Sequence, residues 1–343
     1  MTLSRVVFFL ALAFIGGVFL LHTFGVVQYE FSEVRGAPRI LQPIKQAFQN
    51  TLRQHIAPPQ GAILGAMTLG NKSQLSNDTK ERLNKAGVRH ITAISGMHVS
   101  ILTILLMSMF LWIGMWRSHA FYVVAFIMLL YILLTGASPS AIRAGIMGSA
   151  VLFAQVIGRM NVSLRMLVFA GAGMLAFDLQ LLGNIGFQLS FLAVFGIITI
   201  SPLLGDMLKK FPNPWHMQDV LIMTISAQVF TLPILLSNFG QISLVSVPAN
   251  LLIVPVLPFV LAFGFLFLIV GTLFEPLGFL FSLPVSLLLH YMTFIIDLFS
   301  QLSFASFEAE PISPFWFAFL YAPLLFILWK HRRRQGIIYQ WLS

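Results

Sequence analysis

The sequence contains no cysteine and few charged residues, and these absences set the first limits on fold and function. Without cysteine the chain has no disulfide, no thiolate metal site and no cysteine nucleophile. Charged residues make up 9% of the chain, whereas a soluble domain contains about 25%. Hydrophobic residues make up 58% and the mean hydropathy is +0.90, so polar residues are too few to cover a water-exposed surface. The composition therefore predicts an integral membrane protein.

The sequence also lacks clusters of His and Asp with the spacing of metal ligands, and it has no secretory cleavage site. The apolar run at 6–27 is longer than the core of a signal peptide, which has about 7–15 residues. We therefore expect a retained N-terminal transmembrane helix, no metal and no other cofactor.

Ten apolar stretches are long enough to cross a bilayer, which takes about 20 helical residues. The predicted fold is an all-α polytopic integral membrane protein with about ten transmembrane helices and a short outer amphipathic helical segment. Pro248, Pro255 and Pro258 each remove a helix hydrogen bond from the eighth stretch, so this stretch is either kinked or broken. The stretches fall at 6–27, 93–116, 120–136, 141–157, 165–182, 185–203, 219–238, 241–272, 276–303 and 313–329.

Basic residues indicate which loops face the cytoplasm, because short inner loops are enriched in Lys and Arg. With the N-terminus inside, the short outer loops near 138, 184, 240 and 308 carry no basic residue. This asymmetry predicts a multi-pass protein of the cytoplasmic membrane with both termini in the cytoplasm. The short inner segments hold Arg5, Arg117, Arg159, Arg165, Lys209, Lys210, Lys330, Arg332, Arg333 and Arg334.

The same topology divides the chain into four parts. They are an N-terminal transmembrane helix (1–29), an outer basic amphipathic segment (30–92), a transmembrane domain (93–330) and a basic cytoplasmic tail (331–343). In the outer segment, apolar residues recur every fourth position from Ile40 to Ile56, which predicts one face of a helix lying on the outer membrane surface. A second short helix is predicted between Ser76 or Asn77 as N-cap and Gly87 just beyond its end. The basic residues expected to attract an anionic polymer here are Arg39, Lys45, Arg53, Lys80, Arg82 and Lys85.

Residues 65–73 resemble a phosphate-binding P-loop, but the spacing is wrong. A P-loop requires Lys directly after its second Gly, whereas Asn71 separates Gly70 from Lys72. No strand precedes the segment. We therefore expect no nucleotide site and no motor activity in this chain.

Ser95 and His98 lie three positions apart at the outer end of the second apolar stretch. Such a pair could serve as a nucleophile and its base, which would suit an intramembrane hydrolase. No carboxylate that could orient the histidine is evident nearby in the sequence. A polar cluster that packs helices or lines a pore is the favoured interpretation, and no catalytic residue is assigned.

Arg143 follows a Ser138-Pro139-Ser140 turn and lies one turn inside the next apolar stretch. It either extends to the lipid headgroups or faces a polar path, since intramembrane cations usually have a functional role. We predict the second arrangement, with Asp178 as the resting partner of Arg143. The candidate residues of this path are Arg143, Ser95, His98, Ser138, Asp178, Gln188 and Asn250.

Taken in order, several short motifs resemble the ComEC-type competence proteins, which internalise DNA. The resemblance extends over roughly residues 60–270 and less clearly to 330. It implies a polytopic channel through which one DNA strand enters while the other is degraded outside. The matching segments are 69–73 (LGNKS), 86–90 (AGVRH), 93–99 (AISGMHV), 136–143 (GASPSAIR), 186–191 (GFQLSF), Leu232-Pro233, Phe239-Gly240, and Asn250 with Pro255.

This chain departs from the fuller members of the family, which also carry an outer oligonucleotide-binding barrel and a metallo-β-lactamase-like domain. Residues 30–92 are too short for such a barrel, and no metal-ligand cluster is present. We therefore expect a channel for single-stranded DNA during natural transformation, without nuclease or other enzymatic activity. Its expected partners are the DNA strand, the bilayer, and a separate nuclease, DNA receptor and cytoplasmic motor. The alternatives are a transporter of a small anionic solute or a hydrolase that uses Ser95 and His98.

Overall fold

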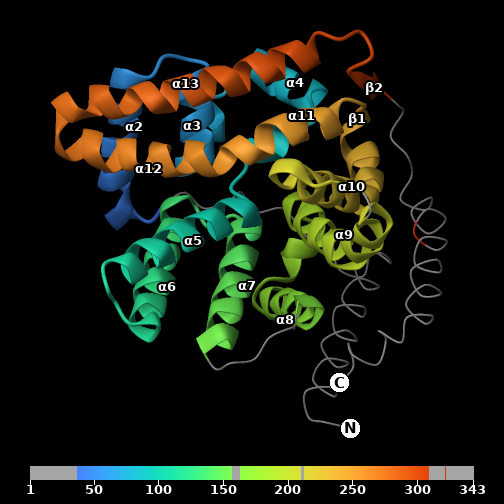
Figure 1. Ribbon diagram of the computed structural model, residues 1–343, viewed down its shortest axis with the longest axis horizontal. Coiled ribbons are helices and arrows are strands. Elements are labelled where there is room, and N and C mark those ends of the chain that lie inside the picture. Colours follow the sequence, from blue (N-terminus) through green and yellow to red (C-terminus); the bar gives the residue numbers. More distant parts are fainter. Residues whose placement is uncertain (1–36, 157–162, 210–211, 309–320, 322–343) are drawn as a thin grey trace. The chain divides into compact units, whose positions relative to one another are not determined.

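The computed structural model describes residues 37–156, 163–209, 212–308 and Tyr321 (Figure 1). The described residues form two units, which are treated separately below. The larger unit comprises 37–156 and 243–307, and the smaller unit comprises the described parts of 163–242 together with residue 308 and Tyr321. The expected first span at 6–27 and the tail at 331–343 lie outside the described residues, as does the expected tenth span apart from Tyr321.

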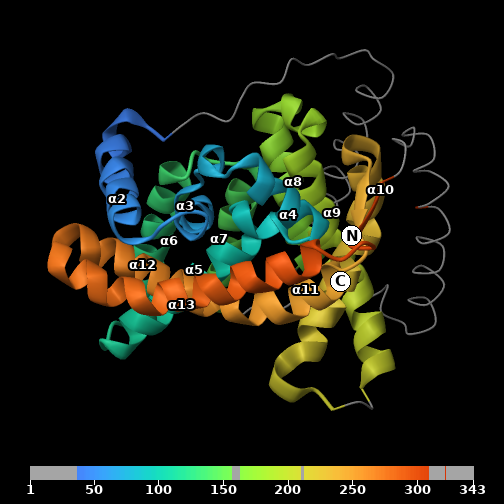
Figure 2. The same cartoon turned by 90° about the horizontal axis from the view of Figure 1, so that it is seen from above.

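The larger unit is built from nine α-helices in the described part of the chain. Two of them, α12 (Leu257–Leu273) and α13 (Glu275–Ser300), form a hairpin whose arms lie side by side in both views (Figures 1 and 2). In Figure 1, α6 and α7 run across the direction of this hairpin. The other helices are α2 (Gln42–His55), α3 (Gln60–Leu69), α4 (Asn77–Lys85), α5 (Gly96–Trp112), α6 (Arg117–Leu134), α7 (Pro139–Val156) and α11 (Ser246–Ile253), with short 3-10 turns η1 (Arg39–Leu41), η2 (Lys72–Gln74), η3 (Arg89–Thr92) and η6 (Val254–Val256).

The smaller unit consists of α8 (Ser163–Phe177), η4 (Leu179–Gly183), α9 (Ile185–Leu208), η5 (Pro214–His216) and α10 (Met217–Phe239). Helices α9 and α10 pack closely, because a Cβ atom at Gly196 would overlap the backbone oxygen of Ser226. Pro233 interrupts the hydrogen bonds of α10, and the Tyr321 hydroxyl donates to the nearby backbone oxygen of Phe230 at 2.6 Å. Two short strands, β1 (Gln241–Ser243) and β2 (Ser306–Glu308), pair with each other.

Each of the eight expected spans from 93–116 to 276–303 contains a helix, which confirms an all-helical protein in outline. Five runs are long and apolar enough to cross a membrane: α6, α9, α10, the run Ser246–Leu273 and α13. The count of ten spans stays a prediction. The eighth span is kinked, since η6 contains Pro255 and connects α11 to α12 without a loop.

Helix α4 confirms the short helix predicted in the outer segment. Ser76 is the N-cap, and its hydroxyl accepts a hydrogen bond from the Thr79 N–H at 3.1 Å. At the other end Gly87 has φ +71° and donates to the Asn84 oxygen, while Val88 donates to the Leu83 oxygen. This pair of bonds is the Schellman motif that commonly ends a helix at glycine.

Helix α3 is a buried apolar helix that the sequence analysis did not predict. Ile63, Leu64, Met67 and Leu69 are each at most 1% exposed and belong to the main core with α12 and α13. A helix that is hydrophobic all round is typical of a buried position. The outer segment is therefore partly core, rather than a purely surface element.

The apolar stripe that runs from η1 through α2 is also divided between core and surface. Leu52 and Ile56 are 4% and 5% exposed and lie in the core, whereas Ile40 and Ile44 are 83% and 48% exposed. The Thr51 hydroxyl bonds that of Thr272 at 2.8 Å and joins α2 to the end of α12. Only the beginning of the stripe remains available for the predicted contact with the membrane surface.

Candidate functional site

Three motifs that are far apart in the sequence meet within the larger unit. They are the end of α3 at Gly70, the segment that leads into α5 from Ile94, and the start of α7. Gly70 has φ +73°, and a Cβ atom there would lie 2.8 Å from the backbone oxygen of Thr135 and 3.6 Å from Ile94 Cδ1. Only glycine fits this position, because the backbone is left-handed and the neighbour is backbone. We call this meeting point the motif junction.

The turn before α7 is held to the segment before α5. The Ser140 hydroxyl donates to the backbone oxygen of Ile94 at 2.6 Å, and it lies 3.3 Å from the Ser138 hydroxyl. Pro139 opens α7, where its missing N–H is not needed. The predicted path residue Ser138 therefore lies at the motif junction, on the turn that positions Arg143.

Arg143 is buried in the motif junction, with 4% of the residue exposed. Its Nη2 atom lies 3.0 Å from the position that a Cβ atom would take at Gly96, the first residue of α5. A guanidinium that extends to the headgroups would be exposed, whereas this one is buried within the unit. That Arg143 faces a polar path stays a prediction. The absence of a side chain at Gly96 allows this close approach.

Ser95 and His98 contact each other at the same end of α5. The Ser95 Oγ and His98 Nδ1 atoms are 2.9 Å apart, and His98 is 1% exposed. In the described part of the chain no carboxylate is hydrogen-bonded to His98, and its Nε2 atom is buried without a hydrogen-bond partner. A hydrolytic triad would need a carboxylate there, so the structure gives no support for the hydrolase alternative.

The P-loop resemblance of residues 65–73 does not correspond to a phosphate loop. Residues up to Leu69 belong to α3, and Gly70 is its left-handed C-cap. A P-loop holds phosphate at the start of a helix, where N–H groups point outward, whereas this segment lies at the end of one. The absence of a nucleotide site stays a prediction.

Two other predicted path residues have local structural roles in the smaller unit. Asp178 caps η4 by accepting from the Gln180 N–H at 2.9 Å, and Gln188 donates to the Leu182 oxygen at 2.6 Å. The expected pairing of Asp178 with Arg143 would join the two units and stays a prediction.

Asn250 and Tyr131 of the larger unit each have a buried polar atom with no hydrogen-bond partner among the described residues. Asn250, a predicted path residue on α11, is 4% exposed and has an unsatisfied Oδ1 atom. Tyr131 on α6 is 5% exposed, and its hydroxyl is unsatisfied too. The sequence analysis missed Tyr131, although a tyrosine in a buried apolar helix normally needs a partner for its hydroxyl.

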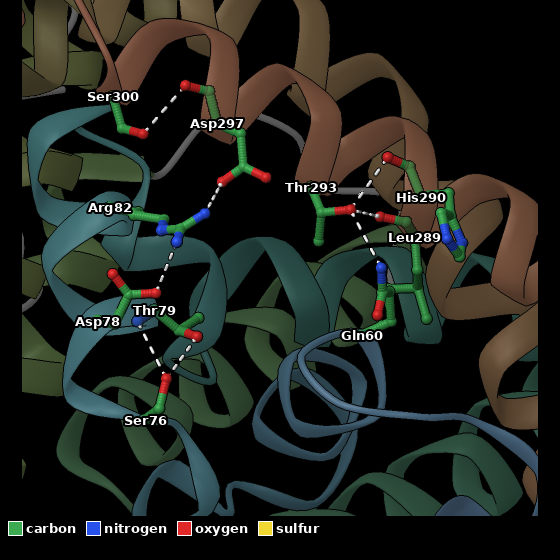
Figure 3. A network of polar contacts seen from close by, with 10 residues as sticks. All are labelled: Gln60, Ser76, Asp78, Thr79, Arg82, Leu289, His290, Thr293, Asp297 and Ser300. Carbon is green, nitrogen blue, oxygen red and sulfur yellow. Dashed lines mark hydrogen bonds and ion pairs between the residues drawn. The ribbon is translucent and has the colours of Figure 1, made fainter.

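The six basic residues expected to attract a polymer fall into two groups. Arg82 bonds Asp297 at 2.8 Å and Asp78 at 2.9 Å, and Lys85 bonds Glu81 at 2.8 Å (Figure 3 shows the Arg82 contacts). Hydrogen bonds to Asp297 and Asp78 raise the pKa of Arg82. Within the described ranges no ion pair involves the other four residues, which are Arg39, Lys45, Arg53 and Lys80.

Comparison with known proteins places these residues in a family. Residues 67–334 match the family described as Competence protein, which is more than half of the chain. Over 209 residues the chain is 32% identical to ComE operon protein 3 of Bacillus subtilis (strain 168). The match covers 61% of this chain and 26% of that relative, so the chain spans about a quarter of its length. No solved structure matches the chain. On the strength of the match over 67–334, this chain belongs to the Competence protein family.

Proposed function

We propose that this chain takes part in DNA uptake during competence, as the membrane-embedded path through which a single DNA strand crosses the cytoplasmic membrane. The observation that carries the proposal is the buried Arg143 at the motif junction. A guanidinium binds phosphate with paired hydrogen bonds, and every nucleotide of a strand supplies one phosphate. The path would therefore recognise the backbone of the strand rather than its sequence.

The basic residues of η1 and α2 support the same proposal. Arg39 of η1 and Arg53 of α2 are exposed, and together with Lys45 of α2 they place positive charge on two consecutive elements that carry no acidic residue. Lys and Arg side chains attract polyphosphate by releasing bound counterions. In this proposal α2 gathers DNA, the path conducts one strand, and a separate nuclease, DNA receptor and cytoplasmic motor supply the remaining steps.

A deletion experiment tests the proposed function. Cells with and without the gene are given duplex DNA labelled on one strand, and label protected from added nuclease is measured. We expect protected single strands in cells with the gene and a loss of at least about a hundredfold without it, since a polyanion does not cross the bilayer unaided. Uptake of labelled inorganic phosphate should be equal in both strains. DNA uptake at the wild-type rate in the deletion strain would contradict the proposal.

We also propose that this chain does not cleave DNA. Among the described residues no group of three or more His, Asp or Glu side chains is placed to hold a metal ion. Purified chain incubated with duplex DNA and Mg²⁺, Mn²⁺ or Zn²⁺ should leave the duplex intact. Because no catalytic residue is assigned, no inactive variant can serve as the control. An unrelated membrane protein purified in parallel serves as the contaminant control instead. Cleavage that exceeds this control would contradict the proposal.

A further inference from the structure

Two motifs of the outer segment, LGNKS and AGVRH, lie against the same helix. The LGNKS motif runs into η2 and the AGVRH motif runs into η3, and both of these turns contact α3. Leu75, Val88 and Ile91 anchor the two turns in the main core, where each is at most 4% exposed. The core therefore fixes the positions of two turns that carry the basic residues Lys72 and Arg89.

Lys72 and Arg89 lie close enough to repel each other. Both residues are exposed, but the protein around the Lys72 amine reduces its contact with water. This desolvation, together with the nearby charge of Arg89, lowers the pKa of Lys72. In the ranges that the structure describes, no ion pair involves either residue, and the Arg89 Nη1 atom donates to the neutral Asn84 Oδ1 at 3.1 Å. The two carboxylates of α4 are already paired with cations of the same helix.

Each of these cations taken alone has a structural explanation. Lys72 follows the C-terminus of α3 and Arg89 follows the C-terminus of α4, and helix C-termini stabilise positive charge. This effect does not explain why the two cations are held together, since like charges at short range raise the free energy of the folded state. An anion that contacts both cations removes the repulsion and adds charge-assisted hydrogen bonds.

We infer that Lys72 and Arg89 together bind one phosphate group of a DNA strand at the outer segment. The inference rests on the proposed function for the identity of the ligand. The planar guanidinium suits two oxygens of a phosphodiester, and the ammonium group supplies a second positive charge. The site is separate from Arg143 and precedes it on the way of the strand.

The surroundings of η2 favour a DNA strand over the phosphate of a lipid headgroup. Every exposed residue from 73 to 78 is polar. A surface that binds headgroups usually carries apolar anchors beside its basic residues, as Ile40 and Ile44 do at the start of the apolar stripe. No such anchor is present among residues 73–78, where the one apolar residue, Leu75, is buried.

Acetylation of lysine in the full chain in detergent tests whether the two charges lie together, because only the neutral amine reacts. The rate at Lys72 is measured by mass spectrometry, with exposed Lys209 of the smaller unit as the internal reference. We expect R89Q to slow the reaction at Lys72, since removal of a neighbouring positive charge raises the pKa of an amine. R117Q, which removes an exposed charge at the start of α6, should leave the rate unchanged. Equal rates in R89Q and wild type would overturn the paired site.

Two further arms of this experiment identify the ligand. Oligothymidylate should protect Lys72 from acetylation, and the same oligomer with an uncharged methylphosphonate backbone should not. Lys209 should react equally in both. Protection of Lys72 by phosphatidylglycerol in the micelles, without protection by oligothymidylate, would overturn DNA as the ligand.

Oligothymidylate binding then tests whether one phosphate is shared. K72Q and R89Q should each weaken the affinity by about three- to tenfold, between the effects of an exposed ion pair and of a charge-assisted hydrogen bond. K72R and R89K, which keep the charge, should retain most of the affinity, and K209Q and R117Q should equal the wild type. The combined K72Q and R89Q variant should lose less than the product of the two single losses, because either change alone already breaks the shared contact. Its log–log salt slope should fall by about 0.7, as for one phosphate contact.

Single losses that multiply, with a fall in slope of about 1.4, would indicate two separate phosphates and overturn the shared site. Wild-type affinity in the combined variant would overturn the site altogether. Unfolding temperatures without ligand identify any variant that fails to fold, and K72R and R89K then carry the comparison. Cells that need the gene for DNA uptake while the chain fails these binding tests would keep the proposed function and lose the inferred site.

Discussion

At Gly70 the backbone has φ +73°, and the backbone oxygen of Thr135 lies 2.8 Å from where a Cβ atom would be. Gly114 also has a positive φ, of +89°, but a Cβ atom there meets nothing within 4 Å. Alanine at either position incurs the cost of a left-handed backbone, about 1–2 kcal/mol. Alanine at Gly70 must in addition displace a neighbouring backbone. We therefore expect G70A to lower the unfolding temperature in detergent clearly more than G114A, and equal losses would contradict the packing of the motif junction.

The residue types of the site could be predicted, whereas their arrangement could not. Arg143 stands out as an intramembrane cation, and the contact of Ser95 with His98 follows from their spacing on a helix. The approach of Arg143 to Gly96 depends on how α5 packs against α7, which no local pattern encodes. The roles of Asp178 and Gln188 as local hydrogen-bonding residues are equally invisible in the sequence.

The basic residues of η1 and α2 differ from Arg82 and Lys85 of α4 in whether they form ion pairs. Exposed ion pairs contribute only about 0–1 kcal/mol each to stability. Arg82 and Lys85 of α4 nevertheless already contact carboxylates. Arg39 of η1 and Lys45 and Arg53 of α2 have no ion pair in the described part of the chain. We therefore expect α2, rather than α4, to dominate the attraction of DNA.

Salt dependence of single-stranded DNA binding measures this difference. If Arg39 of η1 and Lys45 and Arg53 of α2 contact phosphates, the combined R39Q, K45Q and R53Q variant should lower the log–log slope by about 2, at about 0.7 per contact. The combined R82Q and K85Q variant should change it by less than half as much. An unchanged slope in the α2 variant would mean that these charges serve anionic lipid. A larger change in the α4 variant would mean that DNA displaces the carboxylates.

Whether a helix could be predicted from the sequence depended on its caps and on which of its faces is buried. Helix α4 was predicted from its caps, because Ser76 and Gly87 act locally. Helix α3 was missed because it is short and apolar on all sides, so it shows no helical periodicity. The stripe of α2 predicted a helix correctly, but periodicity does not say whether an apolar face meets lipid or protein.

On the scale of the larger unit, α2, α3 and α4 follow the α12–α13 hairpin along its length (Figure 2). A Cβ atom at Gly278 would lie 3.0 Å from His55 of α2, whereas Arg82 of α4 bonds Asp297. Gly278 and Asp297 are 19 positions apart, or about 29 Å at 1.5 Å per helical residue. The hydrocarbon core of a bilayer is about 30 Å thick. If α13 crossed the membrane, α2 and α4 would therefore lie at opposite membrane surfaces. Residues 30–92 could then not lie entirely on the outer side.

We expect the hairpin to lie along the outer membrane surface, which reduces the crossing spans to eight and keeps both termini inside. The turn at Glu275 would face the cytoplasm in the ten-span arrangement, yet residues 273–276 contain no basic residue. Exposed apolar side chains recur along α13 and would lie in the headgroup boundary. These are Leu277, Leu280, Leu283, Leu287, Tyr291, Phe294 and Leu298.

Labelling of single cysteines with an impermeant reagent distinguishes the two arrangements, because the natural chain has no cysteine. Cysteine at Asn50 on α2 and at Glu275 should both react in intact cells, and cysteine at Ser343 should react only after permeabilisation. Ser73, exposed between α3 and α4, is the positive control. Protection of Glu275 with labelling of Asn50 would contradict the packing of α2 on the hairpin.

The central claim concerns the whole molecule, namely that the buried Arg143 lies on the path of a DNA strand. Its most direct test is uptake of labelled DNA by cells carrying R143Q, R143K or R117Q at matched membrane levels of the protein. We expect a loss of at least about tenfold in R143Q, because a charge-assisted hydrogen bond contributes about 1.5–3 kcal/mol. R143K should retain part of the uptake, since Lys keeps the charge without the paired geometry, and R117Q should equal the wild type. Uptake at the wild-type rate in R143Q would contradict the account.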